Sequence, residues 1–343
     1  MTTPRLAGLL SAALLGLAVG VAHAQDKKLV LRVADSFPPG HAIPDYATKW
    51  WMDAVTKATQ GAVEFEYYPA EQLGKAKDLL ALTQSGVADI AYVGPSYVSD
   101  KMPLSAVSQL PGMFTSACVG TSAYWKLAKD GVLRTQEFAT NGIRPLFAFV
   151  APPYQVFTTK RRPDVLKNME GMKLRTTGGA MDLMARKLKA VPVQMAPPDM
   201  MESLTRGTID GGVLAVTSVI AYDFTRAVRY ATIGENFGSF VGTYSISEAK
   251  WQKLPANVQK AMLELGEQAV QRTCQLMDKN EETLFEKARQ AGVSLLRLPE
   301  AEHKELAHLF DSLAKEWAEG LDRRGKPGTE TLKAYRAAMN ERR

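Results

Sequence analysis

Hydrophobic positions in the first part of the chain alternate between strand spacing and helix spacing. Residues 29–34 form an apolar run that predicts a buried strand, and residues 35–41, with two prolines and a glycine, predict an irregular loop after it. Over residues 44–59 apolar side chains recur as on one face of a helix. Residues 63–68 alternate apolar and polar side chains, which indicates a half-buried strand.

The same succession continues with a helix over residues 75–85 and a strand over residues 87–93. Such alternation is typical of an α/β fold with a largely parallel sheet. Residues 78–89 and 199–210 also share one pattern. In each, a helix begins with Asp and ends at a Gly, and the third residue of the strand that follows is another Asp. The Gly suits a left-handed helix stop, and the Asp can orient the strand through backbone hydrogen bonds. We therefore expect two similar α/β lobes.

The last third of the chain contains a much longer helical pattern. Apolar positions recur at near-helical intervals over residues 256–291, which predicts a helix of about 54 Å at a rise of about 1.5 Å per residue. Such a helix is longer than one small lobe, so we expect it to lie across both. From Gly320 onward the composition predicts a polar helix and tail.

Residues 1–24 have the three regions of a secretory signal peptide. Arg5 supplies a positive charge, residues 6–21 form the apolar core, and Ala22-His23-Ala24 supplies the cleavage site. An uncleaved anchor is the alternative, but the sixteen core residues are short for a hydrocarbon layer of about 30 Å. We expect cleavage after Ala24, a periplasmic mature protein, and no stable membrane insertion after signal cleavage.

Composition and charge narrow the function classes. The 343 residues are 46% hydrophobic and 23% charged, as in a globular protein of about two domains. The formal net charge is +6, and the basic residues are spread along the chain except for clusters at 160–162 and 323–326. We find no basic stripe with stacking aromatic residues, so we expect solvated surface and no nucleic-acid partner.

Cysteine and histidine content bears on metals and catalysis. Cys118 and Cys274, the only cysteines, could form one disulfide in an oxidising compartment, and two unrelated buried thiols are an equally open interpretation. Too few ligands exist for a zinc site, so we expect no metal and no cofactor. Common hydrolase, zinc-protease, P-loop and dinucleotide motifs are missing from the sequence, and His303 and His308 have solvent-face spacing. We expect no enzyme, since an enzyme would need a nucleophile–base pair for which the sequence offers no candidate.

Arg175 is the strongest candidate for binding chemistry. It stands with Lys173 on one face of a short strand over residues 171–176, which a Thr-Gly-Gly turn connects to a helix. A cation beside a helix N-terminus concentrates positive potential, and a planar guanidinium can hold a carboxylate by two parallel hydrogen bonds. An exposed basic strand face is the alternative. His41 lies in the first strand-to-helix loop, where α/β folds place ligands.

Several motifs also stand in the order of one known family. They are His41 after the first strand, Pro69-Ala70-Glu71-Gln72-Leu73-Gly74, Gly86-x-x-Asp89, Gly171-Met172-Lys173-Leu174-Arg175, Val191-Pro192-Val193-Gln194-Met195, and Leu204-x-x-Gly207-x-x-Asp210-Gly211. Through these motifs, the signal sequence and the long helix, the whole mature chain resembles the solute receptors of tripartite ATP-independent periplasmic (TRAP) transporters, the DctP family.

The resemblance implies two α/β lobes joined by crossing strands and a hinge, with a cleft that closes over an organic acid. We expect lobe I to hold residues 26–152 and 240–279, and lobe II to hold residues 153–239 and 280–343. The resemblance also implies that Arg175 pairs with the ligand carboxylate and that the closed receptor delivers the acid to an ion-driven TRAP permease. A periplasmic sensor that presents the same class of acid to a membrane kinase is the alternative.

Two departures from the family pattern bear on the ligand. Gln155 stands where some sugar-acid receptors carry an arginine, and Gly212-Val213-Leu214-Ala215 stands where many members place Asn or Trp after the Asp-Gly pair. We therefore expect a small monocarboxylate or one with an apolar or aromatic tail. The candidates for the tail's pocket, with ordinary core packing as the alternative for each, are Phe37, Tyr92, Leu214 and Phe237.

Overall fold

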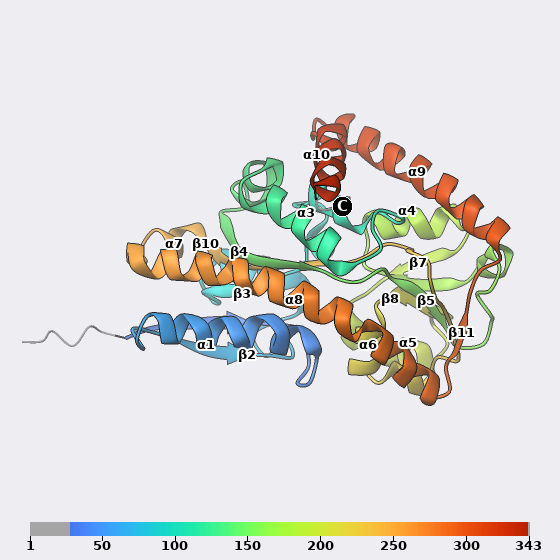
Figure 1. The fold of residues 1–343 in the computed structure, drawn as a ribbon, viewed down its shortest axis with the longest axis horizontal. Coiled ribbons are helices and arrows are strands. Elements are labelled where there is room, and N and C mark those ends of the chain that lie inside the picture. The colour runs from blue at the N-terminus through green and yellow to red at the C-terminus, as the bar shows by residue number, and fades with distance from the viewer. Residues whose placement is uncertain (1–27, 342–343) are drawn as a thin grey trace, which may run out of the picture.

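The computed structural model describes residues 28–341, which form two β-sheets flanked by helices (Figure 1). The strand order of the first sheet is β2 (Val63–Tyr68), β1 (Leu29–Ala34), β3 (Ile90–Val93), β10 (Val241–Ser247), β4 (Ile143–Val150). The strand order of the second sheet is β11 (Ser294–Leu296), β9 (Tyr230–Thr232), β5 (Gln155–Thr158), β8 (Gly211–Leu214), β6 (Lys173–Thr176), β7 (Val191–Gln194). The helices are α1 (Lys49–Ala58), α2 (Leu79–Gln84), α3 (Ala117–Lys129), α4 (Ala180–Lys187), α5 (Met200–Thr205), α6 (Val216–Ala221), α7 (Glu248–Trp251), α8 (Ala256–Gln290), α9 (Glu300–Asp322) and α10 (Gly328–Asn340).

This arrangement confirms the predicted α/β fold with two lobes, each built on one sheet. The expected signal peptide, residues 1–24, lies outside the described residues. Within residues 28–341, no helix combines the length and apolar character that a membrane span requires.

The chain passes between the two sheets twice. β4 in the first sheet leads directly into β5 in the second, and β9 in the second leads back to β10 in the first. Each sheet places one of these strands antiparallel between two others, with β10 between β3 and β4 and β5 between β8 and β9. Segments 151–154 and 233–240 therefore connect the lobes. The exact lobe limits given by the sequence stay a prediction.

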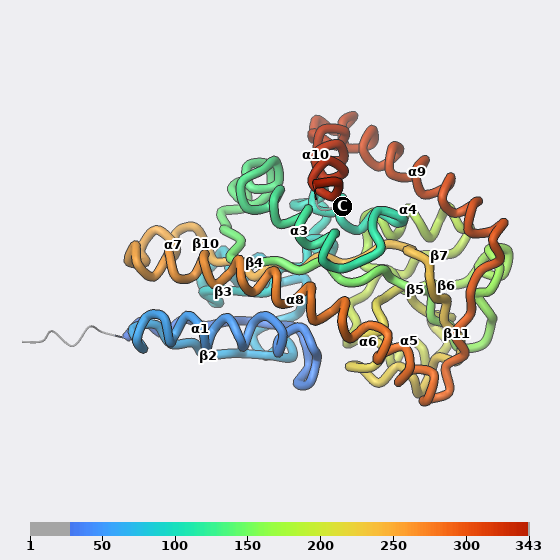
Figure 2. Tube along the Cα trace, viewed as in Figure 1, coloured from blue at the N-terminus to red at the C-terminus, as the bar shows by residue number. Residues whose placement is uncertain are grey.

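Helix α8 confirms the predicted long helix and lies along both lobes (Figure 2). It contacts α1 and β4 of the first lobe and α6 of the second. The helix approaches β4 closely, because a Cβ atom at Gly266 would lie 2.1 Å from the Leu146 carbonyl oxygen. The indole Nε1–H of Trp51 in α1 donates to the Met262 carbonyl at 3.1 Å. Glycine at this crossing lets the helix lie directly on the strand.

A helix is present after Gly320, as predicted, but it is amphipathic and packed against the protein rather than polar. Helix α9 continues past Gly320 to Asp322, because the apolar stripe that holds Trp317 also includes Leu321. Helix α10 then packs against α3, and the buried Tyr335 hydroxyl donates to the Gly120 carbonyl at 3.2 Å. A single Gly inside an amphipathic helix did not end it, since burial of the stripe outweighs a propensity cost of about 1 kcal/mol.

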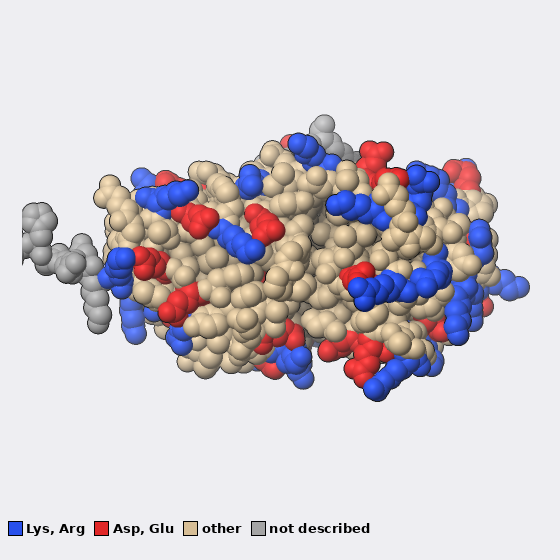
Figure 3. All heavy atoms as spheres, turned by 90° about the horizontal axis from the view of Figure 1, so that it is seen from below, with Lys and Arg blue, Asp and Glu red and all other residues tan. Residues whose placement is uncertain are grey.

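The basic cluster at residues 160–162 is engaged within its own lobe. Arg161 donates to the carbonyls of Asn168 and Glu170 at 3.1 and 2.7 Å, and Arg162 pairs with Asp164 at 2.8 Å. On the face shown in Figure 3, Lys and Arg side chains are interspersed with Asp and Glu, with more basic atoms on the right half. These contacts agree with the expected solvated basic surface.

The two copies of the helix–Gly–strand pattern have the same structure. Each copy consists of a 3₁₀ turn, a short helix, a Gly with positive φ and a strand. In the first lobe these are Ala76–Asp78, α2, Gly86 and β3. In the second lobe they are Pro197–Asp199, α5, Gly207 and β8. In each copy the Asp carboxylate accepts a hydrogen bond from the backbone of the adjacent strand. Asp89 accepts from the Arg32 N–H at 2.9 Å and Asp210 from the Lys173 N–H at 2.8 Å.

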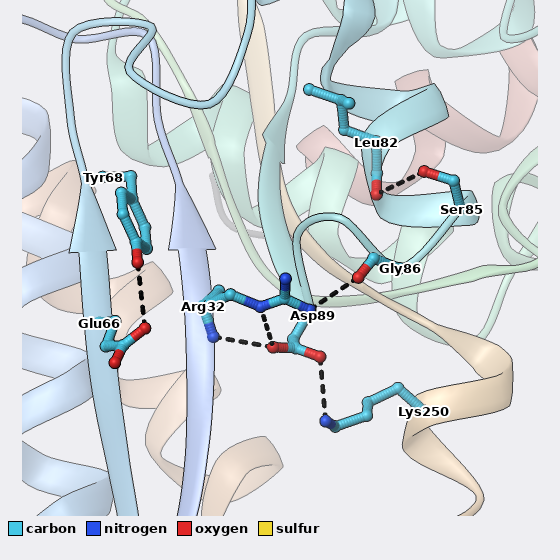
Figure 4. Close-up of polar contacts among 8 residues, drawn as sticks. All are labelled: Arg32, Glu66, Tyr68, Leu82, Ser85, Gly86, Asp89 and Lys250. Carbon is cyan, nitrogen blue, oxygen red and sulfur yellow. Dashed lines mark hydrogen bonds and ion pairs between the residues drawn. The ribbon is translucent and has the colours of Figure 1, made fainter.

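Asp89 has further partners directly before β3, the central strand of its sheet. Figure 4 shows its carboxylate between the side chains of Arg32 and Lys250, at 3.2 and 2.9 Å. Strand β3 begins at Ile90, directly after Asp89, rather than at residue 87 as predicted. The expected role of the Asp in orienting strand entry is confirmed in both lobes.

A disulfide between Cys118 and Cys274 decides between the two interpretations of the cysteines. It joins the first turn of α3 to the middle of α8. One helical turn further along α8, the Asp278 carboxylate accepts from the N–H groups of Ala117 and Cys118 at 2.6 and 3.1 Å. An acid at a helix N-terminus satisfies free N–H groups and complements the helix dipole. The start of α3 is therefore attached to α8 by one covalent and two polar contacts.

We expect removal of this disulfide to destabilise the protein by about 2–5 kcal/mol, because the bond closes a loop with a sequence separation of 156 residues. Urea unfolding of the Cys118→Ser/Cys274→Ser double variant measures the change. Reduced wild-type protein is the matched control and should unfold with the variant. Equal unfolding midpoints for oxidised wild type and variant would contradict the expectation.

Candidate functional site

Arg175 lies in the middle of the second sheet. Strand β6 pairs with β7 on one side and β8 on the other, so its second half is surrounded. The Arg175 side chain is only 1% exposed, while Lys173 at the start of the strand is exposed. On β8, a Cβ at Gly212 would lie 3.2 Å from the Arg175 Cβ, so glycine leaves room for the arginine stem. The alternative of an exposed basic strand face is therefore wrong for Arg175.

The guanidinium of Arg175 has neutral partners. Its Nε donates to the Met195 carbonyl at 2.8 Å and its Nη1 to the Val213 carbonyl at 3.3 Å, and its side chain forms a hydrogen bond with that of Tyr97. Among residues 28–341, no Asp or Glu oxygen lies within 4.0 Å of the guanidinium. A buried charge is costly without a counter-charge. This cation is positioned by carbonyl groups and is not neutralised by the described residues.

The N-terminus of α4, the helix that follows Arg175, contributes less positive potential to the site than the sequence suggested. The turn before α4 uses Gly178 and Gly179 with φ of 94° and 59°, in the region that favours glycine. In the first turn of α4, Asp182 accepts a hydrogen bond from the Thr176 hydroxyl. This helix N-terminus therefore has an acid of its own, and Arg175 is the positive group of the site.

Aromatic rings of the first lobe, of a connecting segment and of the second lobe gather into one cluster. Phe37 stacks on His41 with ring centroids 4.2 Å apart and lies 4.9 Å from Tyr92. The other rings that contact this group are Phe149, Tyr97, Phe240 and Tyr222. We call these seven residues the aromatic cluster. Three of them, Phe37, His41 and Tyr92, were candidates from the sequence.

The aromatic cluster reaches Arg175 from the opposite lobe. Burial raises the pKa of Tyr97, and the positive charge of Arg175 opposes that shift. The same charge opposes the burial-driven rise in the pKa values of Tyr154 and Tyr222. His41 in lobe I meets Tyr222 in lobe II at a ring-centroid distance of 5.9 Å. The lobes therefore face each other with rings around one buried cation.

The loop that presents Phe37 and His41 is held by Asp35. The Asp35 carboxylate is 1% exposed and accepts hydrogen bonds from the hydroxyls of Tyr67 and Tyr244 at 2.9 and 2.6 Å and from the Phe37 N–H at 3.1 Å. Burial raises the pKa of Asp35 to about 6. Sequence reasoning did not single out this residue, although an acid directly after a buried strand is a usable signal.

The Pro69–Gly74 motif braces the same loop. The N–H groups of Ala70 and Glu71 donate to the carbonyls of Phe37 and Asp35, both at 2.9 Å. Ala70 and Glu71 have φ of 52° and 62°, a left-handed conformation that costs of order 1–3 kcal/mol for such residues. Two strained residues are thus kept in place by hydrogen bonds to the residues that precede His41.

His41 is buried and neutral. Its ring is 2% exposed, and burial lowers its pKa to about 3 although the negative charge of Asp45 acts in the other direction. Its Nδ1 accepts a hydrogen bond from the Ile43 N–H at 3.2 Å. The ring thus enters the aromatic cluster without charge.

The remaining candidates divide between two places. Leu214 is buried at the end of β8, directly after Val213, whose carbonyl binds Arg175. Gln155 instead bonds through its amide to the Thr232 hydroxyl and the Glu235 carbonyl, and Phe237 contacts Phe310 of α9. Gln155 and Glu235 line a cavity of about 1160 Å³ between α8 and α9, whose lining does not include Arg175. The predicted roles of Gln155 and Phe237 in ligand binding stay predictions, and the side-chain contacts of these two residues do not support them.

Four aromatic neighbours were not identified from the sequence as site candidates: Phe149, Tyr154, Tyr222 and Phe240. Tyr154 and Phe240 stand in or beside the connecting segments, and Tyr222 follows α6 in the other lobe. A local pattern cannot show that these positions meet, because the crossing strands bring them together. The signal that the sequence did offer was an aromatic residue next to each predicted crossing of the chain between the lobes.

We expect Asp35 to make stability fall as the pH rises. Its pKa is raised from 3.8 to about 6, so its contribution is complete below pH 3.8 and is lost as the pH rises through about 6. The loss corresponds to about 2–3 kcal/mol. Urea unfolding at about pH 4 and about pH 7 should show a smaller pH dependence in Asp35→Asn than in wild type.

The pH dependence of Asp35→Asn must be compared with that of wild type, because other acids also contribute to it. Burial raises the pKa values of Glu137 and Glu281 to about 7. Asp53→Asn, at an exposed position of α1, is the matched control and should leave the pH dependence unchanged. Identical pH dependence in Asp35→Asn and wild type would show that Asp35 does not titrate in this way.

Comparisons with known proteins identify relatives that match the chain over most of its length. The chain is 25% identical over 333 residues to the outer membrane transporter protein TsaT of Comamonas testosteroni, covering 96% of each chain. A TRAP solute-binding protein of Rhodoferax ferrireducens T118, crystallised with copurified benzoate, has a TM-score of 0.84 at 24% identity and covers 92% of this chain and 98% of its own. A TRAP periplasmic solute-binding protein of Bordetella bronchiseptica with bound (R)- and (S)-mandelate has a TM-score of 0.84 at 20% identity and covers 92% and 100%.

A family model covers most of the chain. The model for bacterial extracellular solute-binding proteins, family 7, matches residues 33–320, which include both sheets except for the first residues of β1. The two-lobed fold agrees with the TRAP solute-binding structures. The chain therefore belongs to the DctP family, family 7 of the bacterial extracellular solute-binding proteins.

Proposed function

We propose that this protein is the periplasmic receptor of a TRAP transporter and captures an organic acid by pairing the acid's carboxylate with Arg175. One observation carries the proposal. Arg175 is 1% exposed, has carbonyl and hydroxyl partners, and has no acidic partner among residues 28–341. A carboxylate would supply the missing counter-charge in a geometry that the planar guanidinium favours.

Closure of the lobes would make this pair strong. Arg175 belongs to lobe II, while Phe37, His41 and Tyr92 belong to lobe I. An exposed ion pair contributes about 0–1 kcal/mol, whereas the same pair away from water is attracted much more strongly. An acid that contacts both lobes binds the closed form better than the open form, and only this difference can shift the equilibrium. The connecting segments 151–154 and 233–240 are the natural hinge.

The aromatic cluster supports a monocarboxylate with an apolar or aromatic tail. Leu214 and the rings of Phe37 and Tyr92 offer apolar contact, and none of these three buried side chains carries the second positive charge that a dicarboxylate needs. The related receptors with bound benzoate and mandelate hold acids of this class. Delivery of the acid to an ion-driven permease, without a catalytic step in the receptor, completes the proposed role.

Replacing Arg175 tests the proposal directly. We expect Arg175→Ala to lower acid affinity about a hundredfold or more, since the acid would lose the buried counter-charge that Arg175 supplies. Arg175→Lys should bind weakly because it keeps the charge but loses the planar fork. Isothermal calorimetry with benzoate, mandelate and aliphatic monocarboxylates measures both, after bound acid is removed by unfolding and refolding.

Lys173→Ala is the matched control, because Lys173 lies two residues away on the same strand and is exposed. It should keep wild-type affinity. Near-native affinity in Arg175→Ala would remove Arg175 from the mechanism.

A second measurement separates a binding role from a structural one. If Arg175 is an uncompensated buried charge, Arg175→Met should make the ligand-free protein equally stable or more stable, by up to about 1–4 kcal/mol. Thermal unfolding of ligand-free wild type and variant measures the difference. A clear loss of stability in Arg175→Met would indicate that the guanidinium mainly supports the fold.

A further inference from the structure

His41 has a ring nitrogen, Nε2, that finds no hydrogen-bond partner among the described residues. Its Nδ1 accepts a hydrogen bond from the Ile43 N–H at 3.2 Å and therefore carries no hydrogen. Because the buried ring is neutral, its hydrogen must be on Nε2, which makes Nε2 a donor. Within residues 28–341, Nε2 has no hydrogen-bond partner although the ring is 2% exposed. Buried donors are nearly always paired, so this one needs an explanation.

The position of the ring suggests that explanation. One face of the imidazole stacks on Phe37 at 4.2 Å, and the ring meets Tyr222 of the other lobe in an edge arrangement at 5.9 Å. Phe37 in turn contacts Tyr92 and Phe149 of the aromatic cluster. His41 thus stands at the boundary between the lobes, on the lobe opposite Arg175.

We propose that the bound acid carries, besides its carboxylate, one uncharged acceptor oxygen (hydroxyl, keto or amide) that receives the His41 Nε2–H. This inference rests on the proposed function. Arg175 would hold the carboxylate from lobe II, and His41 would hold the second oxygen from lobe I. Only an acid with both groups would satisfy both buried donors, so His41 would determine specificity.

The charges near His41 explain why the second oxygen is uncharged. The charged group that acts on His41 is Asp45, which is negative and pairs with Lys49 at 2.7 Å. The direct neighbours of the ring, Phe37, Ile43 and Tyr222, carry no positive charge. A second carboxylate at this place would be buried beside a neutral donor with a negative charge near it. Dicarboxylates are therefore disfavoured.

Matched acids on one scaffold test the specificity in the wild-type protein. Phenylacetate, mandelate and phenylglyoxylate differ in the oxygen at one carbon, and benzoate, 3-hydroxybenzoate and isophthalate make a second series. By calorimetry we expect the hydroxy or keto acid of at least one series to bind about tenfold or more tightly than the parent acid. Isophthalate should bind more weakly than 3-hydroxybenzoate.

His41→Phe removes the donor and keeps a ring that can stack on Phe37. We expect it to reduce the preference for the oxygen-bearing acid over the parent acid, both measured in the same variant, to about twofold or less. His303→Phe is the matched control, because His303 is 52% exposed and pairs with Glu235 away from the aromatic cluster. It should leave the preference unchanged.

The outcomes separate this inference from the proposed function. Equal affinity for parent and oxygen-bearing acids in wild type, or an undiminished preference in His41→Phe, would overturn the inference while acid binding through Arg175 stands. Binding of none of the acids tested, or acid binding that is insensitive to Arg175→Ala, would count against the proposed function itself. If His41→Phe does not fold, the wild-type series decides the question by itself.

Discussion

The positive charge of Arg175 is kept almost completely from water and has no acid beside it among residues 28–341. Two backbone carbonyls and the Tyr97 hydroxyl orient the guanidinium. Dipoles of this kind reduce the cost of burying a charge but do not cancel the charge. The rest of the fold must therefore provide the stability that tolerates this group, and an anion from outside would relieve it.

The two-lobed construction places the parts of the site on bodies that can move apart. Arg175 and Leu214 come from the second sheet, while Phe37, His41 and Tyr92 come from the first. The connections between the sheets are short, and α8 lies along both lobes with its middle attached to α3 through Cys274 and Asp278. In such an arrangement, a small ligand that touches both lobes can change their relative position.

Several hydrogen-bonded carboxylates and backbone groups support the site without contacting the Arg175 guanidinium. Asp35, with its two tyrosine hydroxyls, and the strained backbone at Ala70 and Glu71 hold the loop that presents Phe37 and His41. Asp89 and Asp210 make corresponding backbone contacts in the two lobes. These contacts give the acids of the two repeated motifs a structural role.

The sequence by itself determined the local elements and the identity of the cation. Hydrophobic spacing predicted β1, the helix after it and the full length of α8, and the Gly and Asp pattern predicted the repeated unit, because these features depend on neighbours within a few turns of chain. Tertiary structure alone decided which side chains meet. It buried Arg175, paired Cys118 with Cys274, brought Tyr222 to His41, turned Gln155 toward another cavity and packed Phe237 against Phe310. These contacts join residues far apart in the chain through crossing strands, and the spacing of residues along one segment holds no information about its partners in another.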